Sequence, residues 1–130
     1  MLVLIVDDDN LIVEMTSRLV STIENITPAG FTDPIQALAW CRLNEPDVVM
    51  VDYHMPELDG LEFIREFRSL PGKEATPIIM VTSETDETLK HRALKLGAND
   101  FISKPVKLPE LKARIMKSLE FLDPSRRRAD

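Results

Sequence analysis

Short apolar runs alternate with longer amphipathic stretches along almost the whole chain. The runs read Leu2–Val6, Val48–Val51, Ile78–Val81 and Phe101–Ser103. The first three are continuously apolar, which is typical of strands covered on both faces of a sheet. Strands that alternate with helical stretches indicate βαβ units, so the pattern predicts an α/β fold around a parallel sheet.

Amphipathic periodicity predicts five helices between and after these runs. The first spans about residues 10–24. Asp33 and Pro34 supply an N-cap and a first-turn proline for the second, and Gly97 is expected to end the fourth. The fifth has Pro109 in its first turn. The apolar positions that mark the five helices are Leu11, Met15, Leu19 and Ile23; Ile35, Leu38 and Ala39; Leu61, Ile64 and Phe67; Leu89, Ala93 and Leu96; and Leu108, Leu111, Ile115, Leu119 and Leu122.

The second strand, near residues 26–31, is the weakest of the five because it contains Pro28. A proline cannot donate to a ladder hydrogen bond, so this strand is expected at a sheet edge. A doubly wound, five-stranded sheet in the order 2-1-3-4-5 has its second strand at an edge. The sequence therefore predicts a flavodoxin-like (βα)5 fold.

Length and composition fit one globular domain. The chain has 130 residues and a net charge of −6, a charge that disfavours contact with nucleic acid or anionic membrane. The lone Cys41 is expected to pack inside. No run is long enough to span a membrane, and the first apolar run is too short for a signal peptide, so we expect a cytoplasmic protein. The domain is expected to cover residues 1–122, with 123–130, including Arg126-Arg127-Arg128, as a solvated tail or the start of a linker.

Polar residues stand where the predicted strands end. Asp7 and Asp8 follow the first strand, Asp52 the third, Thr82 the fourth and Lys104 the fifth. The carboxyl edge of an open parallel sheet is where such folds bind ligands. Two carboxylates about 4 Å apart repel by roughly 4 kcal/mol at an effective dielectric constant of 20. One lysine cannot balance three acids, so the cluster calls for a hard cation such as Mg²⁺.

The neighbouring polar residues have a simpler reading. Asp9 or Asn10 is expected to cap the first helix, since Asp and Asn are preferred at N-caps. His91 lies between Lys90 and Arg92 on the fourth helix and is expected to face solvent.

Several short motifs lie at or near the predicted strand ends. They are Val6-Asp7-Asp8, Val51-Asp52-Tyr53-His54-Met55-Pro56, Leu58-Asp59-Gly60, Val81-Thr82-Ser83, and Gly97-Ala98-Asn99-Asp100-Phe101 before Lys104-Pro105. With these motifs in this order, the chain from about Leu2 to Leu122 resembles the receiver domains of two-component response regulators in bacterial signalling. Any one motif is a weak signal, whereas all of them in register are a strong one.

The resemblance implies a phosphoacceptor site. Asp52 would accept a phosphoryl group from a histidine kinase or phosphotransfer protein. Asp8, Asp52 and the backbone carbonyl of His54 would bind Mg²⁺, or Mn²⁺ in its place, and Asp7 would act through water. Lys104 would pair with Asp52 and then with the phosphoryl oxygens.

It also implies a switch. Thr82 would bond a phosphoryl oxygen and move toward it, and Phe101 would rotate into the vacated space. This change would reach the face made by the fourth helix, fifth strand and fifth helix, where an output domain or protein partner would bind. The Lys104-Pro105 peptide is often cis in this family, against a general frequency of about 5–6% for X-Pro bonds.

Two rim residues stand at positions that tune the lifetime of the phosphoryl group in this family. These are His54, two residues after the acceptor, and Glu84, two residues after Thr82. The His54 side chain could contact the phosphoryl group, hinder attacking water or point to solvent; we expect the last, while its carbonyl serves the metal.

Partners and output are less closely defined by the resemblance. No direct contact with nucleic acid or membrane is expected, pairing with a second copy stays open, and no enzymatic activity beyond the domain's own phosphorylation and dephosphorylation is expected. The stretch Ala37–Cys41, with Asp52-Tyr53 and Gly60–Phe63, is similar to receivers that precede HD-GYP cyclic-di-GMP phosphodiesterases.

Three other classes compete with this interpretation. A haloacid dehalogenase-type phosphohydrolase also uses an Asp nucleophile, but it needs an acid where this chain has His54, and its nucleophile lies on the first strand. A flavodoxin-like or dinucleotide carrier needs a glycine- or hydroxyl-rich phosphate loop where this chain has Asp7-Asp8-Asp9. A pseudo-receiver that serves only as an interaction module normally lacks the acidic residues present here.

Overall fold

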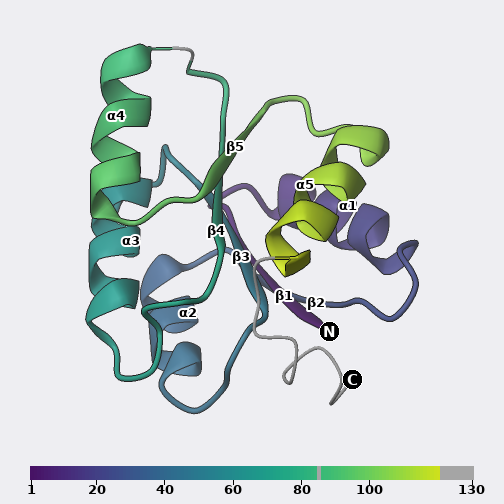
Figure 1. Ribbon diagram of the computed structural model, residues 1–130, viewed down its shortest axis with the longest axis horizontal. Helices are drawn as coiled ribbons and strands as arrows, with labels where there is room; N and C mark the ends of the chain where they lie inside the picture. Colours follow the sequence, from purple (N-terminus) through teal and green to yellow (C-terminus); the bar gives the residue numbers. More distant parts are fainter. Residues whose placement is uncertain (85, 121–130) are drawn as a thin grey trace.

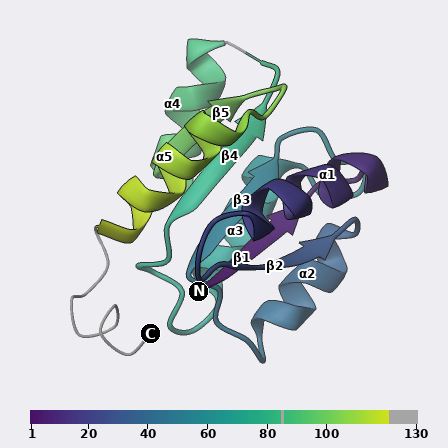
Figure 2. The ribbon, with the colours of Figure 1, turned by 90° about the vertical axis from the view of Figure 1, so that its right-hand side faces the viewer.

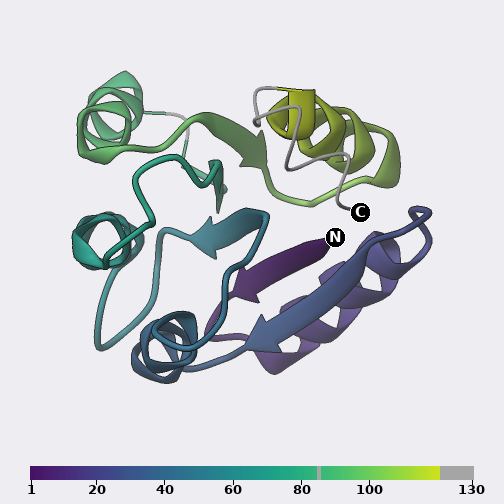
Figure 3. The same ribbon diagram turned by 60° about the horizontal axis from the view of Figure 1, so that its bottom comes forward.

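The computed structural model describes residues 1–84 and 86–120, in which helices and strands alternate as predicted. The elements are β1 (Leu2–Val6), α1 (Asn10–Ser21), β2 (Thr27–Phe31), α2 (Pro34–Cys41), β3 (Val48–Asp52), α3 (Gly60–Ser69), β4 (Ile78–Thr82), α4 (Glu87–Leu96), β5 (Asp100–Ser103) and α5 (Leu108–Glu120). Figures 1 and 3 show three layers, with α2, α3 and α4 on one face of the sheet and α1 and α5 on the other.

The sheet is parallel throughout and has the predicted order β2-β1-β3-β4-β5, so the doubly wound, flavodoxin-like prediction is confirmed. Pro28 lies on edge strand β2, in register with Val3 of β1. An edge strand tolerates proline because one of its sides makes no ladder. Because all strands run in the same direction, their carboxyl ends lie at one edge of the sheet.

Two apolar cores join the layers. Every residue of β3 and β4 is buried, and successive side chains on a strand point to opposite faces. One core lies under α2, α3 and α4 and includes Phe63 and Phe67. The other lies under α1 and α5 and includes Ile5 and Ile115. Together they fix the strand ends on which the polar residues stand.

The helix ends follow the predicted capping chemistry. The Asp9 carboxylate accepts from the backbone N–H groups of Leu11 and Ile12, and the Asp33 carboxylate caps α2 by accepting from the Ile35 N–H. Gly97 ends α4 with φ of 120°, a conformation that side chains other than glycine rarely adopt. Helix α1 ends at Ser21 and is therefore shorter than predicted. Beyond it, Asn25 adopts a φ of 66° and turns the chain toward β2.

The structure tests the predicted burial of Cys41 and exposure of His91, but it does not describe the predicted tail. Cys41 is buried, as expected, and that burial raises the pKa of its thiol to about 11. His91 is exposed, also as expected. Leu122 and the tail 123–130 lie outside the described residues, so the boundary at 122 stays a prediction. Within the described part of the chain, no helix is both long and apolar enough to cross a membrane.

Candidate functional site

The polar residues predicted to converge come from four adjacent strands. Asp52 and Thr82 are the last residues of β3 and β4, while Asp7 and Lys104 directly follow β1 and β5. The register brings these ends level, since Asp52 pairs with Val81. Carboxylate oxygens of Asp7, Asp8 and Asp52 all lie within 4.8 Å of one another. The sheet topology therefore builds the acidic cluster from segments far apart in the sequence.

Lys104 is the cation of this cluster. Its Nζ lies 3.0 Å from Asp52 Oδ1 and 3.1 Å from Asp7 Oδ2. The pair with Asp52 agrees with the prediction, whereas the second contact, with Asp7, was not foreseen. Asp7 Oδ1 accepts from the backbone N–H of Asp9 at 2.9 Å, so both oxygens of Asp7 have a partner. Asp7 is thereby tied to the lysine and to the start of α1.

The Asp52 carboxyl group is held in an unfavourable environment for its charge. Burial raises its pKa above the usual value; the hydrogen bond from Lys104 opposes that effect, and the charges of Asp7 and Asp8 add to it. Burial alone would lower the pKa of Lys104, but its hydrogen bonds to and charge interactions with the two aspartates outweigh burial and raise it. Lys104 therefore stays charged, while the negative charge of Asp52 is disfavoured by its burial and by the neighbouring aspartates.

The cluster has the donor set of a hard-cation site. Asp7 and Asp52 are buried and Asp8 is exposed, so the group opens to solvent on one side. Carboxylate oxygens with room for water are what Mg²⁺ prefers. Three acids face one lysine, and a divalent cation would balance that charge. The residues present therefore fit Mg²⁺.

A glycine lets the loop after Asp52 close against its strand. A Cβ on Gly60 would lie 2.6 Å from the backbone oxygen of Asp52 and 2.9 Å from Cα of Tyr53, distances too short for any side chain. The Gly60 N–H donates to the Tyr53 carbonyl at 2.8 Å, and Asp59 begins α3 with a capping box. The start of α3 thus holds the segment that contains the backbone carbonyl of His54.

Thr82 and Phe101 lie on the neighbouring strands. Thr82 is buried, and its Oγ1 accepts from the backbone N–H of Glu84 at 3.0 Å. Phe101 is half-buried against the core beneath α4, and Lys90 Nζ lies 6.0 Å from the centre of its ring. The Lys104-Pro105 peptide is cis, as predicted.

The rim residues His54 and Glu84 touch each other, which the sequence interpretation did not anticipate. His54 Nε2 lies 2.9 Å from Glu84 Oε1, and both side chains are largely exposed. The prediction that His54 faces solvent is therefore confirmed, with a partner in addition. Both residues stand two positions beyond the ends of adjacent parallel strands, and that equal spacing is the signal that could have found the pair.

An apolar groove adjoins the site on the α1 side. It has a volume of about 320 Å³ and includes Lys104 and Pro105. Helix α1 buries Val13, Thr16 and Val20, which leaves its markers Leu11 and Met15 exposed. Figure 2 shows α1 and α5 on this face of the sheet. The other residues that line the groove are Ile12, Met15, Thr16, Leu19 and Val106.

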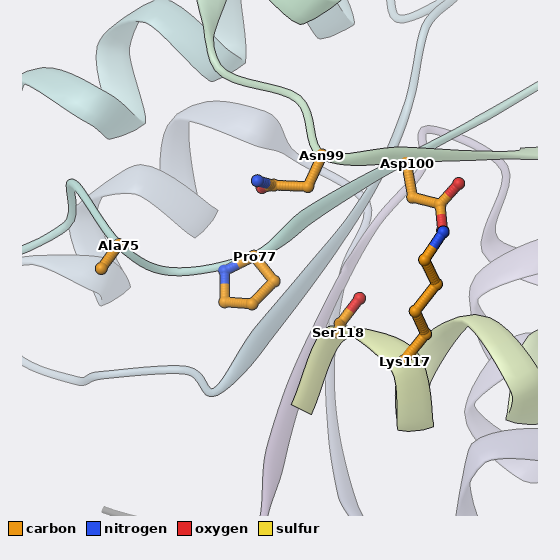
Figure 4. Close-up of a pocket in the computed structure, with 6 residues that line it drawn as sticks. All are labelled: Ala75, Pro77, Asn99, Asp100, Lys117 and Ser118. Atoms are coloured by element: carbon orange, nitrogen blue, oxygen red, sulfur yellow. The ribbon is translucent and has the colours of Figure 1, made fainter. Parts of the chain in front are cut away.

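A second hollow, of about 340 Å³, lies near the amino ends of β4 and β5 (Figure 4). Most of its polar groups already have partners within the protein. Asn99 Oδ1 accepts from the Ile78 N–H at 2.8 Å, and Asp100 lies 3.3 Å from Arg114. Ser118 donates to a backbone carbonyl of its own helix. The bonds of Asn99 and Asp100 join β4 and α5 to β5, so three of the four polar residues of this hollow already have partners, and the fourth is Lys117.

Arg68 is the centre of a cluster of hydrogen bonds beside that hollow. It donates to the Lys73 and Gly97 carbonyls at 2.7 and 2.6 Å and to Asn99 Oδ1 at 3.1 Å. These bonds tie α3 to the loop before β4 and to the end of α4. The sequence interpretation did not single out Arg68, because nothing in its local pattern marks it as different from an exposed helical arginine.

The fold and the polar residues at its strand ends together define a doubly wound α/β protein with an acidic, lysine-containing site at the carboxyl end of its sheet. Residues 3–116 match the family described as the response regulator receiver domain. The chain therefore belongs to the receiver domains of two-component response regulators, a family of signalling phosphoacceptors.

Individual relatives agree with this assignment. The chain is 40% identical over 129 residues to the cyclic di-GMP phosphodiesterase response regulator RpfG of Xanthomonas campestris pv. campestris (strain 8004), covering 95% of this chain and 33% of RpfG. It is 37% identical to the DNA-binding response regulator MtrA of Mycobacterium tuberculosis (strain CDC 1551 / Oshkosh), covering 87% of this chain and 48% of MtrA. The chain thus spans between a third and a half of these relatives.

Solved structures show the same fold. Chemotaxis protein CheY4 of Vibrio cholerae is 30% identical, with a TM-score of 0.86 over 91% of this chain and 98% of CheY4. The receiver domain of sensor histidine kinase PA1611 from Pseudomonas aeruginosa PAO1 has a TM-score of 0.83 at 24% identity, over 92% of this chain and 97% of that one. That structure holds a magnesium ion coordinated in its active-site cleft.

Proposed function

We propose that Asp52 is the phosphoacceptor of this receiver and that Asp8, Asp52 and the His54 backbone carbonyl hold Mg²⁺ beside it. The observation that carries the proposal is the convergence of three carboxylates at the ends of adjacent strands, two of them paired with Lys104. Receiver domains bind Mg²⁺ in their active sites, and the donor set here suits that ion or Mn²⁺. Asp7, whose oxygens both have partners, would act on the metal through water.

Phosphoryl transfer to the protein needs a nucleophile and groups that stabilise the negative charge on the phosphoryl oxygens. An Asp52 carboxylate oxygen forms a bond to phosphorus while the bond between phosphorus and the donor histidine nitrogen breaks, and the electron pair stays on that nitrogen. The Lys104 ammonium group and the Thr82 hydroxyl then bond the phosphoryl oxygens. When bound, Mg²⁺ supplies further positive charge for those oxygens. Asp7 holds Lys104 within reach of both the carboxylate and its product.

The proposal is tested by incubating the protein with acetyl phosphate and Mg²⁺ and measuring its intact mass. We expect one labile phosphoryl adduct, mapped to Asp52, that does not form when EDTA is present from the start. Asp52→Asn should take up none, whereas Asp9→Asn, which changes only a helix cap, should be labelled normally. If Asp52→Asn took up a phosphoryl group at the wild-type rate, at any residue, the assignment would be refuted.

The same experiment separates the receiver from two of the competing classes. A haloacid dehalogenase-type hydrolase would release phosphate from small esters continuously, whereas this receiver is expected to stop at one adduct per chain. A pseudo-receiver would show no adduct and no Mg²⁺ dependence. The complete acidic set, and the position of Asp52 on β3 rather than β1, favour the phosphoacceptor.

The apolar groove on α1 suits the phosphoryl donor, a histidine kinase or phosphotransfer protein. It contains Lys104, so a protein seated there reaches the acceptor, and its exposed Met15 gives an apolar contact. We expect Met15→Glu to slow transfer from the kinase at least tenfold while leaving labelling by acetyl phosphate unchanged. Met116→Glu, an exposed apolar position on α5, is the matched control.

The contact between His54 and Glu84 would set the lifetime of the phosphoryl group by limiting the access of water. If the pair acts as one unit, His54→Ala and Glu84→Ala should change the autodephosphorylation rate by similar factors, and the double variant should add little to either. The rate is followed from the decay of the adduct after acetyl phosphate is removed. Unchanged decay in both single variants would exclude this role.

The output is proposed to pass through Thr82 and Phe101 to the face formed by α4, β5 and α5, where an output domain or protein partner would bind. The likeness to RpfG makes a cyclic di-GMP phosphodiesterase a candidate output for a longer protein. We propose a cytoplasmic location for this signalling, without direct contact of the receiver with nucleic acid or membrane.

A further inference from the structure

Helix α2 presents an apolar face to solvent. Ile35, Ala39 and Leu43 are all exposed, and they recur at every fourth position, so they line one side of the helix and its final turn. Leu43 is 88% exposed and Ile35 is 54% exposed. Leu38 and Trp40 flank this stripe and are half-buried. We call Ile35, Ala39 and Leu43 the α2 stripe.

Other helices also expose apolar residues, among them Leu11 and Met15 on α1, but there they stand among charged residues. The outward residues of α3, for example, include Glu62, Arg65 and Glu66, whereas Pro34–Cys41 has no charged residue at all. A helix that is apolar all round is normally covered on every side. Within the described residues, nothing covers the α2 stripe, and the edge strand β2 beside it leaves this corner of the molecule open (Figure 3).

We propose that the α2 stripe is a self-association surface on which a second copy of this chain packs with its α2 antiparallel. The stripe is symmetric about Ala39, so in this arrangement Ile35 of each copy meets Leu43 of the other. The small side chain of Ala39 at the centre lets the two helices approach closely. A two-fold pairing of this kind uses the same patch on both copies and closes on itself.

Charge at the ends of the stripe fits the same arrangement. Asp33 begins α2 and Arg42 follows its last residue, so the antiparallel pairing places Arg42 of each copy about one helical turn from Asp33 of the other, with the acid Glu45 also near that end. Arg42 is exposed, with no ion-pair partner among residues 1–84 and 86–120, and the pairing places it opposite Gln36 of the second copy. The opposed helix dipoles also favour it. A parallel pairing would instead bring like charges together.

The interface is small, since it rests on one short helix from each copy. Stable protein interfaces bury about 1,200 Å² or more, and we expect this one to fall below that, with a dissociation constant on the order of 10⁻⁴ M. Nothing in the pairing uses Asp52, so the inference does not depend on the proposed phosphoacceptor role.

Sedimentation equilibrium tests the proposal at protein concentrations up to about 1 mM, well above the expected dissociation constant. Trp40, the sole tryptophan, gives a second signal because it lies beside the stripe. We expect a monomer–dimer equilibrium in the wild type and in Asp52→Asn. Leu43→Glu should weaken dimerisation at least tenfold, whereas Leu94→Glu, at an exposed apolar position on α4, should leave it unchanged.

A charge exchange tests the antiparallel register. Arg42→Glu alone should weaken the dimer, and adding Gln36→Lys should restore it, because each new lysine faces a new glutamate of the other copy. A wild-type chain that stays monomeric over the whole range would overturn the proposal, as would a dimer insensitive to Leu43→Glu. The first result would leave the stripe to a different protein or a further domain, and the second would place the dimer on another face.

Discussion

At the amino end of the sheet one guanidinium group faces three oxygen acceptors, whereas at the carboxyl end three carboxylates face one ammonium group. At the first end, both terminal nitrogens of Arg68 donate hydrogen bonds. At the second end, the charges of Asp7, Asp8 and Asp52 exceed what Lys104 can offset. Both clusters join residues far apart in the sequence, but only the second brings several like charges together.

The difference separates a structural cluster from a functional one. A polar group whose hydrogen bonds are all made contributes to stability and has little left to offer a ligand. A cluster of like charges at an edge open to solvent raises the free energy of the folded protein, because the charges repel each other. A bound cation reduces that repulsion. The sign and satisfaction of the charges, rather than burial alone, therefore indicate which end of the sheet does the chemistry.

Removing Arg68 gives the largest expected loss of stability. Arg68→Met keeps the length of the side chain but loses bonds to two carbonyls and to Asn99, so the free energy of unfolding should fall by about 2–4 kcal/mol. Urea denaturation measures this, and Arg65→Met, an exposed position on the same helix, should change it by less than about 0.5 kcal/mol. Labelling of the folded Arg68→Met protein by acetyl phosphate should be unchanged; a large loss of labelling would mean that the two ends are coupled.

Adding Mg²⁺ should act only at the carboxyl end. At about ten times the dissociation constant, a ligand that binds only the folded state stabilises it by about 1.4 kcal/mol. We expect this increase in wild type and in Arg68→Met, and a much smaller one in Asp8→Asn and Asp52→Asn. Thermal or urea unfolding with and without Mg²⁺ measures it. Equal stabilisation of all four proteins would place the ion elsewhere.

The pH dependence of stability should reveal the cost of the Asp52 charge. Because burial raises its pKa in the folded state, the folded protein holds more protons than the unfolded chain at pH values between the two pKa values. Stability without Mg²⁺ therefore falls as pH rises through that window. Asp52→Asn should lack this fall, so its stability relative to wild type should increase with pH. A relative stability that decreases with pH would contradict the raised pKa.

The smallest effect is expected between the two ends, where Lys90 lies over the ring of Phe101. Lys90→Met should lower stability by about 0.5 kcal/mol through the lost cation–π contact. It should also increase the mobility of the Phe101 ring, as measured by NMR relaxation, because α4 then holds that ring less firmly. Arg92→Met on the same helix is the control, and equal effects of the two substitutions would remove any special role for Lys90.

The sequence was most informative where one residue decides between few alternatives. Pro28 identified the edge strand and so the strand order, and strand-end positions brought together Asp7, Asp8, Asp52 and Lys104. Strand positions alone could not specify which atoms meet, so the contact between Lys104 and Asp7 was missed. The exposure of Leu11 and Met15 on α1 could not be predicted either. Apolar spacing indicates a helix but does not say which of its residues the sheet covers.

The central claim is tested most directly by a crystal structure of the protein with Mg²⁺ and beryllofluoride, an analogue of the phosphoryl group. We predict beryllofluoride on an Asp52 carboxylate oxygen, within hydrogen-bond distance of Thr82 Oγ1 and Lys104 Nζ. Mg²⁺ should be bound by Asp8, Asp52 and the His54 carbonyl. Beryllofluoride or Mg²⁺ bound away from Asp52, or neither bound at saturating concentration, would contradict the account.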